Sequence, residues 1–308
     1  MSFLDTQYHS LISHAMSQPL RGDRTQTGTR SFFHGTIRHD MREGFPAITT
    51  KRLAWHQVAV ELLWFLRGKS DLRYLVDNNC NIWTGDAYAN YLASEKNEDI
   101  TIEEFSRRIL DDPQFSDKHG NLGPIYGVQW RNWGVTDGRT GHVDQIEKVY
   151  SSLRTNPTSR RHLVSAWNVG ELESMVLPPC HYSFQFYVEE IDGVKHLSLM
   201  WNQRSSDLFL GLPFNIASYG LLLSIMAHAL EMKPYMLIGV LGDCHLYENH
   251  VRAAEELLGR STSKYGYPDL YMAENGFDVL FNQRIQNPTI FKLLGYKSFD
   301  SIKAKLNN

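Results

Sequence analysis

The sequence predicts an α+β fold in which helices pack on a β-sheet. Two apolar segments have helical length, 55–67 and 215–230. Runs typical of β-strands lie between them, at 162–167, 181–188 and 196–201. Within the second run Phe184, Phe186 and Val188 alternate along the chain, which indicates a strand with one buried face. Long apolar helices combined with such strands are typical of helices layered on a sheet.

The remaining elements follow from the same patterns. The helix at 55–67 should end before Gly68. The stretch 84–122 is polar and irregular, with a short helix at 102–110, and we expect it to be a surface insertion. Four further elements are expected: a strand at 29–38, helices at 71–78 and 144–154, and a strand at 235–241.

Composition limits the class of protein. A chain of 308 residues with 42% apolar residues can bury a large core, in one domain or two. The net charge of −3 does not suggest the basic face that DNA or RNA binding needs. Cysteines 80, 180 and 244 form no CxxC pair, so neither a disulfide framework nor a metal site is indicated. The N-terminus does not resemble a secretory signal, and we expect a cytoplasmic protein.

The segment 208–230 is a candidate membrane span by its length and apolar composition. It has 23 residues without Lys, Arg, Asp or Glu, which is long enough to span a bilayer. Pro213 and Asn215 interrupt its first half, and no basic flank sets an orientation. Because helices that are apolar on all sides are usually core helices, we predict a buried helix from Asn215 onward and no membrane partner.

Glu61 is the first candidate for chemistry, because it lies among apolar residues within the helix at 55–67. A carboxylate in such surroundings costs several kcal/mol unless it is paired or its pKa rises. Glu61 therefore either faces a polar stripe of the helix or acts as a general acid or base in a cleft.

Cys180 is the second candidate, since it follows two prolines at the entry to a strand. Adjacent strand residues point to opposite faces, so Cys180 and His181 are not expected to form a thiolate–imidazole dyad. A lone cysteine is either buried and inert or, with positive neighbours, a nucleophile.

Four arginines could supply that positive charge: Arg24, Arg160, Arg161 and Arg204. Each alone is an ordinary surface arginine. Together they would form a phosphate site, to which Ser205 could add a hydroxyl, because guanidinium forks match phosphate geometry.

Asn215 opens the second apolar helix, where it is either an N-cap or a ligand-reading amide. Its side chain carries a donor beside an acceptor, a pattern that matches O4 and N3–H of uracil. His245 and Tyr247 follow the strand at 235–241, where open sheets often bind ligands, although an exposed loop also accounts for them.

Eight motifs in order resemble the thymidylate synthase family and cover about residues 20–304. They are DRTQTGT (23–29), ELLWFL (61–66), GPIYG (123–127), SRR (159–161), PPCH (178–181), QRS (203–205), LPFNIASY (212–219) and GD with the following His245 and Tyr247 (242–247). The resemblance implies one catalytic domain over 1–308, with the insertion at about 84–122. It also implies that a large mixed sheet forms the interface of a homodimer.

The implied activity is transfer of one carbon from the cosubstrate 5,10-methylenetetrahydrofolate to C5 of dUMP, giving dTMP. The implied catalytic residues are Cys180, Glu61, Tyr126, His181, Asn215 and Asp207. The residues implied to bind the nucleotide are Arg24, Arg204, Ser205, Asn215, His245 and Tyr247, with Arg160 and Arg161 from the other subunit. The residues implied to contact the folate are Trp83, Asp207, Gly211 and Phe214.

Each implied role has a chemical reason. Cys180 would add to C6 of the base and so make C5 nucleophilic. Asn215 would read the uracil edge, and Glu61 would organise the waters that move protons at O4. Tyr126 and His181 would belong to the network that removes the C5 proton.

Departures from the family concern the exclusion of water. Family members usually end in an apolar tail that folds over the folate, whereas this chain ends in Lys305-Leu306-Asn307-Asn308. Asn202 replaces the usual tyrosine, and Thr84-Gly85-Asp86 replaces the usual Asp-Glu-Trp. Water in the site would add to the exocyclic methylene intermediate and give 5-hydroxymethyl-dUMP. A dUMP hydroxymethylase is therefore the alternative to methylation.

Three more distant hypotheses meet objections. A dCMP hydroxymethylase would carry an acid in place of Asn215. A cysteine hydrolase conflicts with the adjacency of Cys180 and His181. A non-catalytic nucleotide- or RNA-binding relative would not need Cys180, Glu61, Tyr126 and Asn215 together, and no nucleic acid is expected as a partner.

Overall fold

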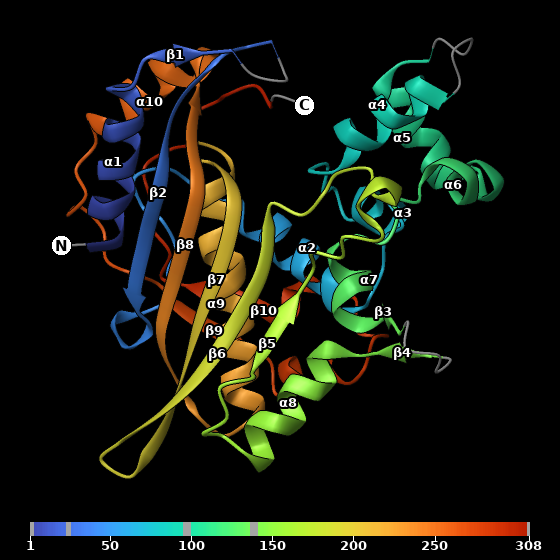
Figure 1. Ribbon diagram of the computed structural model, residues 1–308. Helices are drawn as coiled ribbons and strands as arrows, with labels where there is room; N and C mark the ends of the chain where they lie inside the picture. Colours follow the sequence, from blue (N-terminus) through green and yellow to red (C-terminus); the bar gives the residue numbers. More distant parts are fainter. Residues whose placement is uncertain (1–2, 23–25, 95–99, 136–140, 307–308) are drawn as a thin grey trace.

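The computed structural model describes residues 3–22, 26–94, 100–135 and 141–306. Within these ranges six strands form the central sheet, in the order β1-β2-β8-β7-β6-β5 (Figure 1). They are β1 (Leu20–Arg21), β2 (Thr29–Asp40), β5 (Leu163–Ser165), β6 (His181–Ile191), β7 (Val194–Asp207) and β8 (Lys233–Tyr247). Because β7 and β8 pair in parallel and the other neighbours pair antiparallel, the sheet is mixed, which confirms the predicted α+β class.

The helices and minor strands surround this sheet. The helices are α1 (Phe3–Met16), α2 (Trp55–Leu66), α3 (Arg73–Asp77), α4 (Thr84–Ser94), α5 (Ile102–Asp111), α6 (Pro113–His119), α7 (Tyr126–Arg131), α8 (Gln145–Thr155), α9 (Gly211–Ala229) and α10 (Val251–Leu258). Two small hairpins pair β3 (Trp133–Gly134) with β4 (His142–Val143), and β9 (Asp269–Met272) with β10 (Phe291–Leu294). Short 3-10 turns occupy Met41–Glu43, Leu172–Ser174, Glu248–His250, Gly276–Leu280 and Pro288–Ile290.

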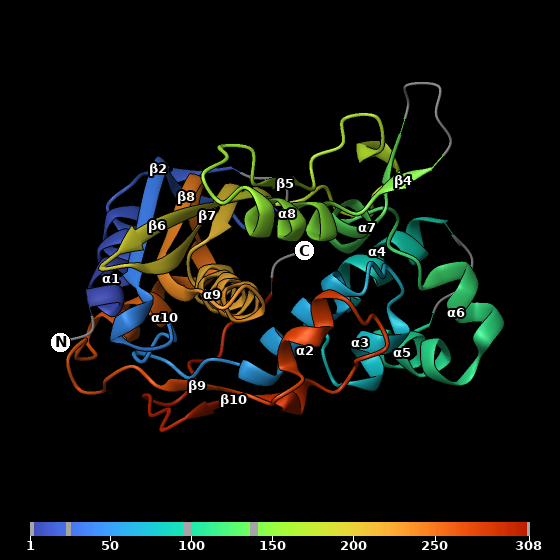
Figure 2. The ribbon, with the colours of Figure 1, turned by 90° about the horizontal axis from the view of Figure 1, so that it is seen from below.

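One face of the sheet is covered by helices. Figure 2 looks nearly along α9 and shows it beneath the sheet, with α1 and α10 beside it. α9 contacts β7, β8 and α2, and α1 contacts β2 and β8. Leu197, Leu199 and Trp201 of β7 point toward these helices and are buried. Because strand residues alternate, this apolar row sets which face of β7 meets the core.

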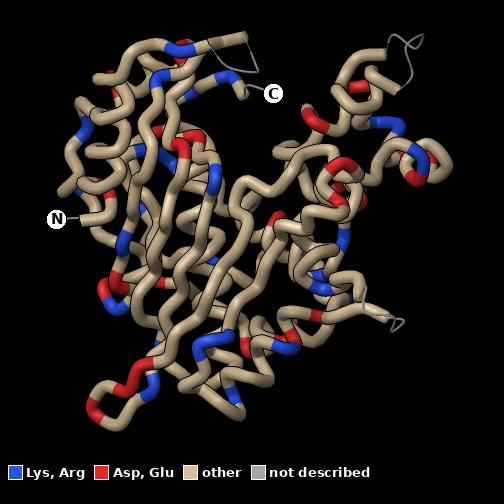
Figure 3. The backbone as a smooth tube through the Cα atoms, viewed as in Figure 1, with Lys and Arg blue, Asp and Glu red and all other residues tan. Residues whose placement is uncertain are grey.

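Among the described residues, no helix lies over the centre of the opposite face of the sheet (Figure 2). Gln185, Tyr187, Met200 and Ile238 alternate with the buried residues of their strands, and the Tyr187 side chain is 57% exposed. Lys, Arg, Asp and Glu mark few positions in the middle of β6, β7 and β8, whereas they are interspersed elsewhere (Figure 3). An uncharged, partly apolar face of this kind is typical of a protein–protein interface.

The predicted buried helix is confirmed, but its start is not where the sequence placed it. α9 is long and apolar enough to cross a membrane, and 72% of its most apolar window is buried inside the fold. It begins at Gly211, so Asn215 lies inside the helix and is not its N-cap. The turn before the helix is held by Asp207, whose Oδ1 accepts the N–H groups of Phe209 and Leu210 at 2.8 and 3.1 Å.

Strand β8 is longer than the predicted 235–241. It continues to Tyr247 because its pairing with β2 continues, with Ser31 opposite His245 and Thr29 opposite Tyr247. The alternative that His245 and Tyr247 lie in an exposed loop is therefore wrong. Both occupy the end of a central strand.

The insertion at 84–122 is more regular than predicted. Outside residues 95–99, which the structure does not describe, it consists mainly of α4, α5 and α6 at the periphery of the molecule (Figure 1). Aromatic rings 4.7–5.7 Å apart hold these helices together, from Tyr88, Tyr91, Phe105, Phe115 and His119. The prediction of an irregular stretch is wrong because this small aromatic cluster stabilises helices that the polar composition did not indicate.

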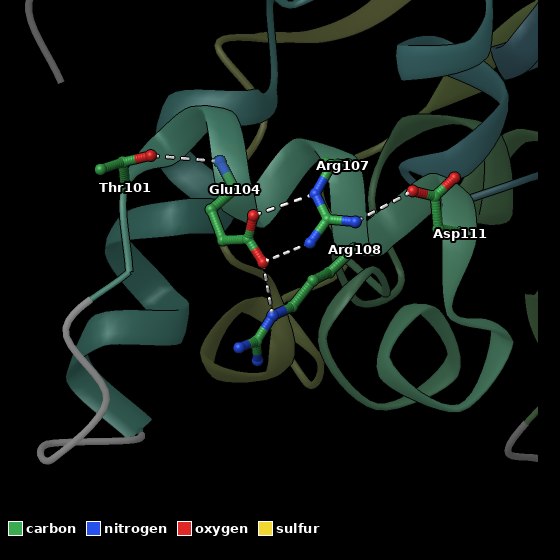
Figure 4. A network of polar contacts seen from close by, with 5 residues as sticks. All are labelled: Thr101, Glu104, Arg107, Arg108 and Asp111. Atoms are coloured by element: carbon green, nitrogen blue, oxygen red, sulfur yellow. Dashed lines mark hydrogen bonds and ion pairs between the residues drawn. The ribbon is translucent and has the colours of Figure 1, made fainter.

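The start of α5 carries a cap and a network of ion pairs (Figure 4). Thr101 Oγ1 accepts the N–H of Glu104 at 3.2 Å. The Glu104 carboxylate accepts hydrogen bonds from Arg107 and Arg108, and Arg107 also pairs with Asp111 at 3.3 Å. Exposed ion pairs contribute little to stability, whereas a helix cap satisfies a backbone donor.

We therefore expect Thr101→Ala to weaken α5 more than Arg107→Ala. Loss of an N-cap costs about 1 kcal/mol, whereas an exposed ion pair contributes little because solvent screens it. Amide hydrogen exchange in α5, compared with wild type, measures both effects. Equal acceleration in the two variants would contradict the assignment of the cap as the stronger contact.

Candidate active site

A pocket of about 740 Å³ lies where β7, β8 and α9 meet α2 and α7. Its lining includes thirteen of the residues that the sequence singled out: Glu61, Trp83, Tyr126, Cys180, His181, Arg204, Ser205, Asp207, Gly211, Phe214, Asn215, His245 and Tyr247. These residues are spread over nearly 190 positions of the sequence, from 61 to 247. The mixed sheet and its helices bring them to one cavity of a size typical for small-molecule sites.

Cys180 lies next to a positive charge. The Arg204 backbone N–H donates to the Cys180 carbonyl at 2.8 Å, and its guanidinium donates to the carbonyls of Pro179 and Pro178 at 2.9 and 2.7 Å. These bonds place Arg204 Nη2 4.0 Å from Cys180 Sγ. A neighbouring guanidinium favours the thiolate form, which is the nucleophilic form of cysteine.

His181 does not serve as the base for Cys180. Its ring stacks on Tyr126 at 4.3 Å between centroids, and its Nδ1 is hydrogen-bonded to Tyr219 Oη at 2.8 Å. Burial lowers the pKa of His181 to about 3, so the ring is neutral near pH 7. A cysteine hydrolase is therefore disfavoured on two grounds: Cys180 and His181 are adjacent in the sequence, and the His181 imidazole is buried and bonded to Tyr219.

Tyr126 contacts both the His181 ring and Cys180. Its hydroxyl accepts the backbone N–H of Cys180 at 2.7 Å. Burial, and next the charge of a Cys180 thiolate, raise the pKa of Tyr126 well above its usual value. Tyr126 thus keeps its proton and can donate it in a hydrogen bond within the pocket.

Glu61 is a buried carboxyl on the pocket wall. Its side chain projects from α2, and Oε1 accepts the indole N–H of Trp83 at 2.8 Å. Burial raises the pKa of Glu61 from 4.5 to about 7, and the hydrogen bond from Trp83 offsets only part of this shift. Of the two sequence interpretations, a polar stripe or a carboxyl in a cleft, the structure supports the cleft.

Asn215 is oriented by a chain of hydrogen bonds. Trp201 Nε1 donates to Gln203 Oε1 at 3.2 Å, and Gln203 Nε2 donates to Asn215 Oδ1 at 3.2 Å and to the Ser205 carbonyl at 2.9 Å. The Trp201 ring lies over Gly239, where a Cβ would come within 2.4 Å of it. The Asn215 amide nitrogen, with two N–H donors, is thereby turned away from Gln203.

His245 is fixed by a neighbour on the same strand. Its Nδ1 lies 3.0 Å from Asp243 Oδ1, and the Tyr247 ring meets it edge to face at 5.2 Å. Because Asp243 occupies Nδ1, the other ring nitrogen is left to face a ligand. His245, Tyr247 and Ser205 thus line the pocket from two adjacent parallel strands.

Two of the predicted arginines, Arg160 and Arg161, do not line this pocket. Arg160 and Arg161 are exposed on the connection between α8 and β5. Arg24 lies outside the described residues. Of the predicted phosphate ligands, the described pocket contains Arg204 and Ser205.

Several lining residues escaped the sequence analysis. Gln203 belongs to the QRS motif, and Asp243 lies two residues before His245, so family motifs marked the position of both residues. Asp86 follows Trp83 by three residues and was noted only as a departure. Arg21 and Leu306 line the pocket from the two ends of the chain, and no local pattern pointed to either.

The arrangement suits addition of a nucleophile to an electron-poor ring. A cysteine beside a guanidinium supplies the nucleophile. Asn215 and Tyr126 supply fixed hydrogen-bond donors, and Glu61 supplies a carboxyl with a pKa near neutrality. Groups placed in advance in this way stabilise charge that develops during a reaction.

Comparisons with known proteins extend over the whole of this architecture. The family model described as thymidylate synthase matches residues 6–308. The thymidylate synthase of Aster yellows witches'-broom phytoplasma is 42% identical over 276 residues, which cover 90% of this chain and 88% of that protein. The thymidylate synthase of Mycoplasma genitalium is 44% identical over 257 residues, which cover 83% and 86% of the two chains.

The raised pKa of Glu61 predicts a pH-dependent stability. Between pH 4.5 and about 7 the folded protein holds a proton that the unfolded chain releases, so stability is lost as the pH rises through this range. Glu61→Gln removes this loss, and the variant should gain up to about 3 kcal/mol relative to wild type between pH 4.5 and pH 8. Urea unfolding at several pH values and one protein concentration measures the difference.

The exposed Glu173 provides the matched control. Glu173→Gln should show the same stability difference from wild type at every pH. A pH-independent difference for Glu61→Gln as well would contradict the buried, proton-holding carboxyl.

Proposed function

The chain belongs to the thymidylate synthase family, and we propose that it catalyses the reductive methylation of dUMP to dTMP within one catalytic domain. The family resemblance of the eight motifs is thus confirmed. The observation that carries the proposed reaction is the Cys180 thiol 4.0 Å from the Arg204 guanidinium, in a pocket shared with Asn215 and Glu61. 5,10-Methylenetetrahydrofolate is the proposed carbon and hydride donor.

In the proposed reaction the Cys180 thiolate adds to C6 of the uracil. The new C–S bond shifts electron density to C5 and O4. C5 then bonds to the methylene carbon of the folate, one of the two C–N bonds of that carbon breaks, and the released nitrogen keeps the electron pair and takes a proton. Arg204 has two functions here, because it favours the thiolate and its guanidinium can also contact the phosphate. Ser205, on the same strand, adds a hydroxyl to that contact.

Asn215 is the proposed reader of the base. The bond from Gln203 leaves its amide N–H groups to donate to O4, and Oδ1 retains a lone pair for N3–H. Cytosine has an amino group at the position of O4, so its donor would face the Asn215 donor. This mismatch supports dUMP rather than dCMP as the substrate.

Proton transfer is assigned to the buried polar groups. Glu61, with a pKa of about 7, can hold or release a proton near neutral pH and is the proposed acid and base at O4 and on the folate. Tyr126 and neutral His181 are proposed to hold the water that removes the C5 proton. His245 and Tyr247 are the proposed ligands of the sugar 3′-hydroxyl.

The folate is proposed to occupy the part of the pocket near Trp83 and Asp207. The Trp83 ring can stack on a pterin, and its N–H fixes Glu61 beside it. Asp207 uses Oδ1 for the turn before α9, and Gly211 and Phe214 in the first turn of α9 complete this wall. These polar and aromatic groups fit a planar heterocycle that carries N–H donors.

A homodimer is the proposed assembly, with the uncovered sheet face as its interface. Tyr187, Met200 and Ile238 lie on this face, which the helices of the described residues leave uncovered. Arg160 and Arg161 of one subunit would then reach the phosphate in the pocket of the other subunit. Arg24 of the subunit that holds the pocket would contact the same phosphate. The reduced cytoplasm is the proposed compartment, because it keeps the Cys180 thiol free to react.

Product analysis tests the proposed reaction. With dUMP and 5,10-methylenetetrahydrofolate the protein should release dTMP and dihydrofolate, whereas dCMP should not react. A nucleotide product heavier by one oxygen, together with tetrahydrofolate, would identify a hydroxymethylase and contradict methylation. Cys180→Ser should lower turnover by about a thousandfold or more, because the covalent route is lost, yet still bind dUMP.

Subunit mixing tests the shared site. Cys180→Ser lacks the nucleophile, and Arg161→Ala lacks the proposed phosphate ligand for its partner. In a mixed dimer one of the two sites keeps both Cys180 and Arg161, and the other site loses both. Because about half of the dimers are mixed after random reassociation, about a quarter of wild-type activity should return. The control is a mixture of Cys180→Ser with the double variant Cys180→Ser/Arg161→Ala. It should remain inactive, because neither subunit carries the nucleophile. No recovery in the first mixture would contradict a site shared between subunits.

A further inference from the structure

The C-terminal segment is tied to the body at three places before it reaches the pocket. Phe299 N–H donates to the Thr49 carbonyl at 2.9 Å. Arg260 Nη1 donates to the carbonyls of Asp300 and Thr50 at 2.6 and 2.8 Å. Farther along, His250 Nε2 lies 2.7 Å from the Lys305 carbonyl. The next residue, Leu306, lines the pocket.

His250 is well placed to hold the end of the chain. It lies just after β8 and is fully buried. Its ring is packed between Phe209 and Tyr247, with centroids at 5.5 and 5.6 Å. Since a carbonyl oxygen can only accept, Nε2 must carry the proton in this bond. A buried ring held by aromatic neighbours provides a rigid anchor for Lys305.

Of the two rings that hold His250, one lines the pocket and the other is bonded to a residue that lines a different wall. Tyr247 lines the wall proposed to bind the sugar. Phe209 is bonded through its N–H to Asp207, which lines the wall proposed to bind the folate. His250 itself does not line the pocket, so it acts through Lys305, Tyr247 and Phe209. The bond to Lys305 therefore sets the position of Leu306 relative to both walls.

We propose that His250 is a positioning residue that latches the C-terminal segment at Lys305, so that Leu306 closes the pocket and directs the reaction to dTMP. This inference rests on the proposed function. It makes the choice of product depend on a hydrogen bond outside the pocket as well as on the residues that touch the substrates.

The chemistry explains why closure decides the product. After C5 is bonded to the transferred carbon, removal of the C5 proton supplies the electron pair of a new C=C bond. The remaining folate nitrogen leaves with its bonding pair, which gives an exocyclic methylene at C5 while Cys180 is still bonded to C6. If the methylene accepts hydride from tetrahydrofolate, the electron pair moves to C5 and O4, the C6–S bond then breaks, and dTMP and dihydrofolate leave. If a water oxygen bonds to the methylene and loses a proton, the same C–S cleavage gives 5-hydroxymethyl-dUMP with tetrahydrofolate. A closed pocket excludes the second route.

Two substitutions separate the latch from simple packing. His250→Phe fills the space but cannot donate to Lys305, whereas His250→Gln keeps a side-chain N–H donor. His56→Phe is the matched control, because His56 Nε2 also lies 2.8 Å from a backbone carbonyl, that of Asn78, away from the pocket. If His250→Phe does not fold, His250→Met serves as the variant without a donor.

We expect His250→Phe to raise the ratio of 5-hydroxymethyl-dUMP to dTMP about tenfold, the order of effect of one lost hydrogen bond. Amide exchange at 300–306 should quicken in the same variant. His250→Gln should restore most of both properties, and His56→Phe should match wild type.

An unchanged product ratio in the folded donor-less variant would overturn the proposal, even if turnover fell. Unchanged exchange at 300–306 would also overturn it. Failure of the proposed function is distinguishable, because wild type itself would then release no dTMP, whereas failure of the latch leaves the wild-type product intact.

Discussion

The contact between Arg204 and the segment before β6 is the constraint on which the site depends. Pairing of β6 with β7 brings Arg204 opposite Cys180, and three hydrogen bonds then fix the arginine to Pro178, Pro179 and Cys180. The guanidinium satisfies backbone carbonyls that no strand partner reaches and at the same time places a positive charge near sulfur. Without this contact, a cysteine on a proline-rich loop would have neither a fixed position nor a reason to ionise.

Around this contact, burial gives neighbouring groups different protonation states. Glu61 and His181 are both buried, yet burial raises the pKa of the carboxyl to about 7 and lowers that of the imidazole to about 3. The same desolvation acts in opposite directions because it disfavours whichever form is charged. The Tyr126 ring contacts the rings of Trp83 and His181, and the raised pKa of Tyr126 means that it keeps its proton. Glu61 can therefore exchange a proton near neutrality, whereas Tyr126 stays protonated and His181 stays neutral.

The ends of the chain meet at the same cavity. Arg21 enters from β1, and Leu306 enters from the C-terminal segment, which contacts Arg260 after α10 and then His250. A site built from both ends of a chain requires the complete fold before it can form. It also lets a contact distant from the chemistry, such as that of His250 with Lys305, affect how well the cavity closes.

The sequence by itself determined the α+β class, the apolar helices α2 and α9, the family and most of the residues that line the pocket, because hydrophobic periodicity and motif order are local properties of a chain. Only the tertiary structure decided that β8 extends through His245 and Tyr247, that Asn215 lies inside α9 and is oriented by Gln203, and that the insertion forms α4 and α6 beside the predicted helix at 102–110. Each depends on a partner in another element: β2 for the end of β8, Gln203 of β7 for Asn215, and aromatic rings from three helices for the insertion. Burial of Glu61 also belongs to this second group, since the same helix could have turned its carboxyl to water. Pairing and desolvation are set by the neighbours that folding supplies, and no local pattern specifies them.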